Sequence, residues 1–296
     1  MNNKMHADEI AINGMLVQKL IETQFSHWSH LPIIPINSSG TDNAIYRLGQ
    51  ELAIRLPRTA SAALQIDKEY QWLPQFAPHL PLAIPVPLGK GLSTEDFPWP
   101  WLIYRWLEGK DATVVHITDL EQAAIDLGHF VLALQKINPA GGPFSRRGKP
   151  LATCDHETRR ALQSLHGLID VDAATRAWEN ALNVPVWHGL PVWTHGDLHA
   201  GNLLVDGDKL TAVIDFGMAG IGDPACDMMV AWTFLSANTR DIFRKVVNPD
   251  DATWARGRGW ALTFGLVALP YYQHTNPVLA GIARRAIEAV LADENI

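Results

Sequence analysis

Two short polar motifs, separated by a segment typical of a β-hairpin, constrain this chain more than any other feature. Residues 195–202 read HGDLHAGN, so Asn202 lies five positions after Asp197, and a later IDFG motif places Asp215 thirteen positions after Asn202. Between the motifs, an Asp-Gly pair at 206–207 separates two apolar runs, which is a strong hairpin signal. Because the two ends of a hairpin are neighbours, we expect Asn202 and Asp215 to reach the same place.

The side chains at these positions suggest a specific chemistry. The pattern H-x-D-x-x-x-x-N followed by D-F-G is typical of the catalytic loop and metal-binding segment of protein kinases. A carboxylate at Asp197 can orient a substrate hydroxyl and accept its proton, which makes it the candidate catalytic residue. Asn202 and Asp215 offer oxygen atoms, the ligands that Mg²⁺ prefers, so we expect them to hold the magnesium that accompanies ATP or GTP.

Residues 195–202, 215–217 and 222–227 together resemble the aminoglycoside phosphotransferase family, which also includes macrolide and choline kinases. The resemblance implies a protein-kinase-like bilobal α+β fold, with a small mixed β-sheet in the N-lobe and a mainly helical C-lobe. It also implies transfer of the γ-phosphate of ATP or GTP to a hydroxyl of a small molecule. An aminoglycoside-type antibiotic is the first expectation for that molecule, and a macrolide or another hydroxylated metabolite is the alternative. Gly196 stands where protein kinases have arginine, which favours a small-molecule acceptor.

The resemblance also implies supporting roles around the loop. Asp227 is expected to accept backbone N–H bonds from the loop and hold it rigid. His195 is expected to pack and hydrogen-bond behind the metal-ligand segment, whereas His199 is expected to be a bystander. Asp223, followed by proline, has the pattern of a helix N-cap.

A cation and a carboxylate are expected to act together in the N-lobe. In such kinases a strand lysine reaches the nucleotide phosphates and pairs with a helix glutamate. Here the matching strand reads LAIRLP over residues 52–57, so the cation is Arg55, and Glu69 on the next helix is its expected partner. Arginine can neutralise phosphate charge bidentately, so its geometry need not copy that of lysine.

Two further N-lobe segments are candidates for nucleotide binding. Ser39, Gly40 and Thr41 lie in a turn between the first two expected strands, where small residues let backbone N–H groups face phosphate oxygens. Tyr104 and Trp106, at the joint between the lobes, are expected to present backbone groups to the purine. No Walker motif occurs in the chain, which disfavours a P-loop fold.

Length and composition agree with a two-lobed protein. The 296 residues, of which 47% are hydrophobic, favour two domains and exclude intrinsic disorder. We expect an N-lobe over residues 1–105 and a C-lobe over residues 106–296. The net charge of −7 argues against a nucleic-acid partner and is compatible with a cationic small substrate. The chain has only two cysteines and no apolar stretch long enough for a membrane span, so we expect a cytoplasmic protein without membrane contact.

Hydrophobic periodicity gives the expected elements. Helices are expected over residues 7–25, 61–76, 120–134, 174–182, 250–269 and 277–292, and strands over 33–36, 44–48, 52–56, 85–89, 101–104, 203–205 and 210–214. The apolar stretch 260–272 is expected to be a buried helix.

Two rival functions remain open. His195, Asp197 and His199 could form a zinc metallohydrolase centre, although this would leave Asn202 and Asp215 unexplained. The chain could also be a catalytically silent kinase-like binding module, since Arg55 replaces the usual lysine. The acceptor pocket is expected among the carboxy-terminal helices, whose acids include Glu157, Glu179, Asp293 and Glu294.

Overall fold

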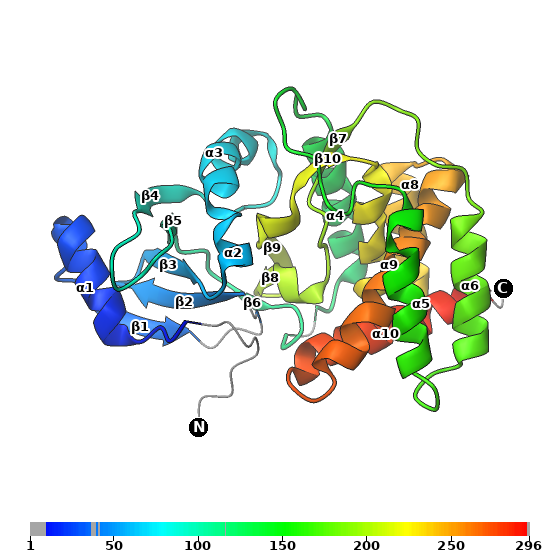
Figure 1. Ribbon diagram of the computed structural model, residues 1–296. Coiled ribbons are helices and arrows are strands. Elements are labelled where there is room, and N and C mark those ends of the chain that lie inside the picture. Colours follow the sequence, from blue (N-terminus) through cyan, green and yellow to red (C-terminus); the bar gives the residue numbers. More distant parts are fainter. Residues whose placement is uncertain (1–9, 37–39, 41, 116, 295–296) are drawn as a thin grey trace. The chain divides into compact units, whose positions relative to one another are not determined.

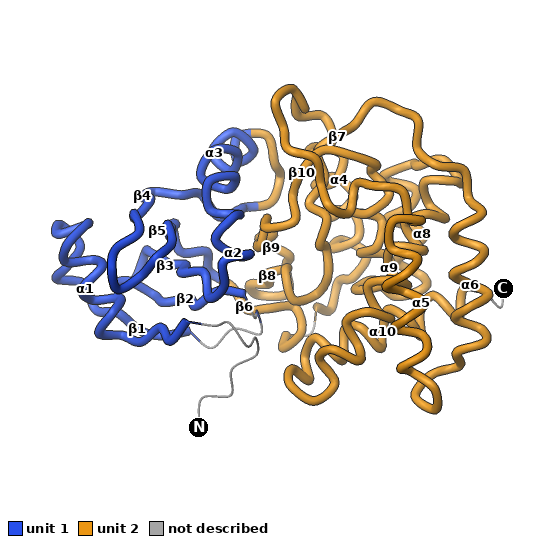
Figure 2. Tube along the Cα trace, in the orientation of Figure 1, with its two compact units in different colours: residues 1–78, 83–108 blue, residues 79–82, 109–296 orange. Residues whose placement is uncertain are grey.

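The chain forms two compact units. The computed structural model describes residues 10–36, 40, 42–115 and 117–294. Unit 1 comprises residues 1–78 and 83–108, and unit 2 comprises residues 79–82 and 109–296 (Figure 2). The sequence placed the boundary at residue 105, and the contacts place it after Glu108. Each unit is described separately below.

Unit 1 is built on a five-stranded antiparallel sheet (Figure 1). The strands are β1 (Ile33–Ile36), β2 (Asn43–Leu48), β3 (Leu52–Pro57), β4 (Pro87–Gly91) and β5 (Trp101–Arg105), in the order β1-β2-β3-β5-β4. The small N-lobe sheet is present, but it was expected to be mixed and is antiparallel in every pair. Tight turns such as that at Gly49, where φ is +61°, can join only antiparallel neighbours.

In the described part of unit 1, three α-helices accompany this sheet. Helix α1 (Gly14–Gln24) begins after Asn13, whose side chain accepts the backbone N–H of Leu16, and it buries Val17, Leu20 and Ile21 in the core of unit 1. The single helix expected over residues 61–76 is divided. It forms the short α2 (Ala60–Ala63), capped by the Thr59 side chain, and α3 (Ile66–Phe76).

Unit 2 is mainly helical. Its helices are α4 (Leu120–Gln135), α5 (Asp155–Ser164), α6 (Val171–Leu182), α7 (Val230–Thr233), α8 (Ala237–Val247), α9 (Asp251–Tyr272) and α10 (Pro277–Glu294). The short strands β6 (Lys110–Asp111), β8 (Leu203–Asp206) and β9 (Lys209–Val213) form one sheet, and β7 (Val192–Thr194) pairs with β10 (Gly220–Gly222). Sequence periodicity did not predict α5, α8 or the β7–β10 pair.

The apolar stretch 260–272 lies in the second half of α9, and most of its side chains are buried, as expected. Helix α9 packs against α10 (Figure 1). A Cβ at Gly265 would lie 2.7 Å from the carbonyl oxygen of Ala283, so glycine permits this close approach. Among the described helices, none is both long enough and apolar enough to cross a bilayer.

The predicted hairpin between the two sequence motifs is confirmed. Strands β8 and β9 pair with Leu203 opposite Val213, and the turn between them includes Gly207 at a φ of +50°. Beyond the last strand pair, the N–H of Ile214 donates to the carbonyl oxygen of Asn202 at 2.9 Å. The hairpin therefore brings Asn202 next to the residue that precedes Asp215.

Candidate active site

The loop that follows β7 is fixed by a buried carboxylate. Asp227, which is fully buried, accepts the backbone N–H of His195 at 2.8 Å and that of Gly196 at 2.7 Å. This confirms the expected anchoring role of Asp227. Burial raises the pKa of Asp227 to about 6, although the two N–H bonds act in the opposite direction.

Gly196 is required by the path of this loop. Its φ is +79°, and a Cβ at this position would lie 2.9 Å from the carbonyl oxygen of Met218. A side chain would therefore be strained by the backbone conformation and would also collide with the neighbouring segment.

His195 stabilises the loop as a neutral imidazole. Its Nε2 donates to the carbonyl oxygen of Ile214 at 3.0 Å, and its Nδ1 accepts the backbone N–H of Asp197 at 3.2 Å. Burial lowers the pKa of His195 to about 4, and the ring also packs against Phe216. Because both ring nitrogens are occupied, His195 cannot bind a metal without breaking the loop, which argues against the metallohydrolase interpretation.

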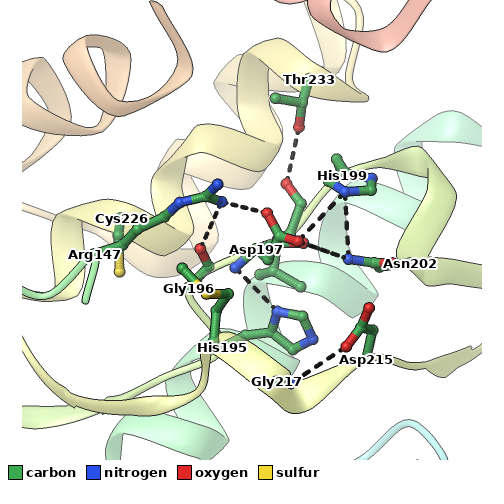
Figure 3. Close-up of polar contacts among 12 residues, drawn as sticks. Arg147, His195, Gly196, Asp197, His199, Asn202, Asp215, Gly217, Cys226 and Thr233 are labelled. Carbon is green, nitrogen blue, oxygen red and sulfur yellow. Dashed lines mark hydrogen bonds and ion pairs between the residues drawn. The ribbon is translucent and has the colours of Figure 1, made fainter. Parts of the chain in front are cut away.

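The carboxylate of Asp197 has different partners on its two oxygens (Figure 3). Oδ1 pairs with the guanidinium of Arg147, whereas Oδ2 lies 3.4 Å from Nδ2 of Asn202 and 3.6 Å from Nε2 of His199. Burial acts to raise the pKa of Asp197, but the positive charge of Arg147 and the nearby imidazoles hold it well below its usual range. Asp197 is therefore ionised at neutral pH.

Asn202 and Asp215 provide oxygen atoms at the two ends of the hairpin. Nδ2 of Asn202 donates to the carbonyl oxygen of Asp197 at 2.8 Å, which commits the amide nitrogen to the loop and leaves Oδ1 as the ligand atom of this side chain. Asp215 has a φ of +62°, and its Oδ1 accepts the N–H of Gly217 at 3.3 Å. Left-handed backbone is uncommon at residues other than glycine and is found at turns, helix ends and functional sites.

These two side chains fit a magnesium ion. Amide and carboxylate oxygens are hard ligands, and Mg²⁺ commonly takes one or two carboxylates together with the phosphates of its substrate. Among the described residues, no group of three His, Cys, Asp or Glu side chains is arranged to hold a metal. A magnesium ion that takes its other ligands from a nucleotide does not need such a group.

Sequence reasoning missed two residues beside Asp197. Arg147, in the segment between α4 and α5, pairs with Asp197 and also donates to the carbonyl oxygen of Gly196 at 2.9 Å. Phe264 of α9 lies 5.5 Å from the Arg147 guanidinium and 5.4 Å from the ring of His199, against which it stacks. No motif marks either residue, because each belongs to a segment far from the loop in the sequence. His199, expected to be a bystander, contributes to this cluster and accepts the N–H of Gly201 on Nδ1.

In unit 1, the expected pairing of Arg55 and Glu69 is present. The guanidinium of Arg55, on β3, forms an ion pair with Oε2 of Glu69, on α3, and both side chains are buried. The hydroxyl of Tyr104 donates to the same Oε2 at 2.5 Å and lies 3.4 Å from Nη1 of Arg55. Three residues that the sequence assigned to nucleotide binding thus bring their side chains together in one buried cluster.

The two residues expected to present backbone groups to a purine, Tyr104 and Trp106, both have backbone positions that are engaged within unit 1. Tyr104 lies within β5, opposite Ala53 and Pro87, and its side chain joins the Arg55–Glu69 pair. The N–H of Trp106 donates to the carbonyl oxygen of Glu51 at 2.7 Å, so it can reach a base only by giving up that bond. The physical reason is that β5 extends through Tyr104, which uses its backbone in the sheet.

The expected phosphate-binding turn can be described only at Gly40, which is exposed. Ser39 and Thr41 lie outside the described residues. Their role in phosphate binding stays a prediction.

Two of the acids considered for an acceptor site are engaged elsewhere. Asp293 accepts the indole N–H of Trp232 at 2.7 Å and pairs with Arg240, while Glu179 lies 3.6 Å from Arg159. Glu157 is exposed, and the side chain of Glu294 is outside the described structure. Asp293 thus serves to fix the end of α10 against α7 and α8.

Comparisons with known proteins agree with this arrangement. A family model described as "Phosphotransferase enzyme family" matches residues 33–260, well over half of the chain. An aminoglycoside 3'-phosphotransferase from Escherichia coli is 36% identical over 78 residues, a match that spans 23% of this chain and 29% of that enzyme.

Solved structures share the fold. The GDP complex of a mutant aminoglycoside 2'-phosphotransferase-IIIa matches with a TM-score of 0.74 and 20% identity, over 96% of this chain and 99% of that chain. The macrolide 2'-phosphotransferase of Brachybacterium faecium matches with a TM-score of 0.60 and 21% identity, over 92% and 97% of the two chains. The fold match and the matched family model confirm the resemblance drawn from the loop and hairpin motifs, and the chain belongs to the phosphotransferase enzyme family.

Proposed function

We propose that this protein transfers the γ-phosphate of ATP or GTP to a hydroxyl group of a small molecule. The observation that carries the proposal is the geometry of the loop and hairpin in unit 2. Asp197 is ionised and held in place, and the hairpin brings Asn202 next to the residue before Asp215. Phosphoryl transfer depends mainly on positioning and on neutralising charge, and these residues are suited to both.

Asp197 is the proposed catalytic residue. Its depressed pKa makes it a weak proton acceptor in the resting protein, so its main contribution is to hold the acceptor hydroxyl in line for attack. Asn202 and Asp215 are the proposed ligands of Mg²⁺, which when bound would neutralise charge on the phosphate oxygens.

The nucleotide contacts of unit 1 are proposals of the same kind. Arg55, held by Glu69, is proposed to neutralise phosphate charge. Ser39, Gly40 and Thr41 are proposed to offer backbone N–H groups to phosphate oxygens. Tyr104 and Trp106 are proposed to present backbone groups to the purine.

An aminoglycoside-type antibiotic is the first proposed acceptor. The enzyme from Escherichia coli and the GDP-bound structure that this chain resembles are both named as aminoglycoside phosphotransferases. The net charge of −7 is compatible with a polycationic acceptor.

A macrolide or another hydroxylated metabolite is the second candidate. The similarity to a macrolide phosphotransferase supports the same candidate.

The proposal can be tested by incubating the purified chain with Mg²⁺, ATP or GTP, and a panel of aminoglycosides, macrolides and uncharged polyols. Mass spectrometry should detect a phosphorylated acceptor with wild-type protein and not with Asp197→Ala. The preferred acceptors distinguish the first candidate from the second. Failure to phosphorylate any compound of the panel would contradict the proposal and favour a silent binding module. Equal product with Asp197→Ala would show that Asp197 is not the catalytic residue.

A further inference from the structure

The segment that carries Arg147 is fixed along β10. The N–H of Ser145 donates to the carbonyl oxygen of Ile221 at 2.9 Å, and the N–H of Ile221 donates to that of Pro143 at 2.8 Å. Asp223 N–H then donates to the carbonyl oxygen of Gly148 at 3.0 Å. Residues 143–148, here called the arginine loop, therefore lie in register with the segment that follows the Asp215 motif.

Glycines allow this contact to be made backbone to backbone. A Cβ on Gly222 would lie 2.5 Å from Cα of Gly148, and a Cβ on Gly220 would lie 2.6 Å from the nitrogen of Ser145. Side chains at these positions would push the two segments apart. The position of the arginine loop is thus determined by its backbone rather than by an adjustable side-chain contact.

The side chain of Arg147 is held by three kinds of contact. Its Nη1 pairs with Oδ1 of Asp197 and donates to the carbonyl oxygen of Gly196, and its guanidinium lies over the ring of Phe264 (Figure 3 shows the first two). Its own backbone N–H donates to Oγ of Ser145 at 3.2 Å. The side chain is still 23% exposed, so the pair is not simply part of the hydrophobic core.

We propose that Arg147 is a positioning residue for Asp197. By holding Oδ1, it leaves Oδ2 as the oxygen that receives the acceptor hydroxyl. Among the described residues, the contacts of Oδ2 are the longer ones of 3.4 Å to Asn202 and 3.6 Å to His199. A carboxylate free to rotate would present either oxygen, and catalysis depends on the orientation of the reacting groups. This inference rests on the proposed phosphotransferase function.

The arrangement also joins the two halves of the proposed site. Arg147 contacts the loop that bears Asp197, while the backbone of the arginine loop is bonded to β10, a few residues beyond Asp215. The position of the proposed catalytic carboxylate is therefore linked to the segment that bears a proposed metal ligand.

The kinetic test compares Arg147→Met, Arg147→Lys and the control Arg146→Met, which removes the same charge from an exposed residue one position earlier. We expect Arg147→Met to lower kcat roughly 10- to 100-fold, the scale of effect that misplaced catalytic groups produce, with the acceptor KM changed less than about threefold. Arg147→Lys should recover much of this loss, because a single nitrogen makes both polar contacts in the wild-type protein. Arg146→Met should match the wild type. A kcat for Arg147→Met within about twofold of that for Arg146→Met would overturn the proposal.

Thermal unfolding tests whether Arg147 and Asp197 interact, and this test does not depend on catalysis. Arg147→Met should lower the Tm by roughly 2–4 °C in the wild-type background, and by less in an Asp197→Ala background, because the acceptor of Arg147 is already removed there. Additive shifts would overturn the inference whether or not the wild-type protein is active. If the wild type phosphorylates no acceptor but the shifts are non-additive, the proposed function fails while Arg147 still holds Asp197.

Discussion

Each unit of the protein has more than one arginine–carboxylate pair, one of which lies among the residues proposed for function, and these two pairs differ in their surroundings. Arg55 and Glu69 lie on a strand and a helix of unit 1, and their side chains are 10% and 1% exposed. Arg147 and Asp197 lie in loops of unit 2, and their side chains are 23% and 19% exposed. Breaking a buried pair leaves an uncompensated charge in a low dielectric, whereas a partly exposed pair contributes little to stability. We therefore expect the first pair to matter most for folding and the second for activity.

The largest expected effect is on catalysis in unit 2. Asp197→Ala should lower kcat roughly 10²–10⁴-fold, the range by which a positioned acid–base group accelerates reactions. Nucleotide affinity, measured by calorimetry, should change less than about threefold, because the proposed nucleotide contacts are made by other residues. Near-normal turnover in this variant would contradict the expectation that the Arg147–Asp197 pair matters for activity.

The second effect is on the stability of unit 1. Arg55→Met should lower the free energy of unfolding by about 3–5 kcal/mol, because Glu69 would remain buried without its counter-ion. The matched control is Lys90→Met, since Lys90 pairs with Asp67 in the same unit, where the Asp67 side chain is 74% exposed. This control should cost about 1 kcal/mol or less. Urea unfolding measures both, and equal losses would show that burial does not distinguish the pairs.

The two pairs also differ in their neighbours. The loop that bears Asp197 includes the buried His195 and is anchored by the buried Asp227, and these two groups have opposite effects on the pH dependence of stability. His195 has a folded pKa of about 4 against an ordinary value of 6.5, so only the unfolded chain gains a proton as the pH falls below 6.5, and stability is lost. Asp227 has a folded pKa of about 6 against 3.8, so the folded protein gains its proton first, and stability increases as the pH falls through 6. The two contributions offset each other between pH 6 and 4.

Substitutions should separate these contributions. From pH 7 to 4.5, His195→Gln should become more stable relative to the wild type, and Asp227→Asn less stable, each by about 2 kcal/mol at 1.36 kcal/mol per pKa unit. Urea unfolding at a series of pH values gives the result. Parallel curves for both variants and the wild type would contradict these opposing shifts.

The contrast between the two pairs also explains which parts of the fold and of the candidate site could be predicted from the sequence. The Arg55–Glu69 pair spans 14 positions across successive regular elements, and the hairpin that brings Asn202 towards Asp215 has a turn with a clear sequence signal. Strand alternation and hairpin geometry are local, so the sequence suffices for both.

Arg147 could not be found in this way. It lies 50 positions before Asp197, in a segment whose place is determined by backbone bonds to β10 and by glycines that allow close approach. Neither β10 nor its pairing with β7 has a hydrophobic period, because the strands are only three residues long. For the same reason the contact of Phe264 with Arg147 was missed, since it depends on how α9 packs and not on local spacing.

The smallest expected effect concerns Tyr104, which contributes to the buried pair without carrying charge. Burial raises the pKa of Tyr104 well above its usual value, so the phenol stays protonated and donates to Glu69. Tyr104→Phe should therefore cost about 1.5 kcal/mol of unfolding free energy, the contribution of a hydrogen bond to a charged group, while kcat stays within about twofold. The control Tyr70→Phe, at a 46% exposed residue of the same unit, should change stability by less than about 0.5 kcal/mol. A loss as large as that of Arg55→Met would mean that the hydroxyl, rather than the guanidinium, compensates the buried carboxylate.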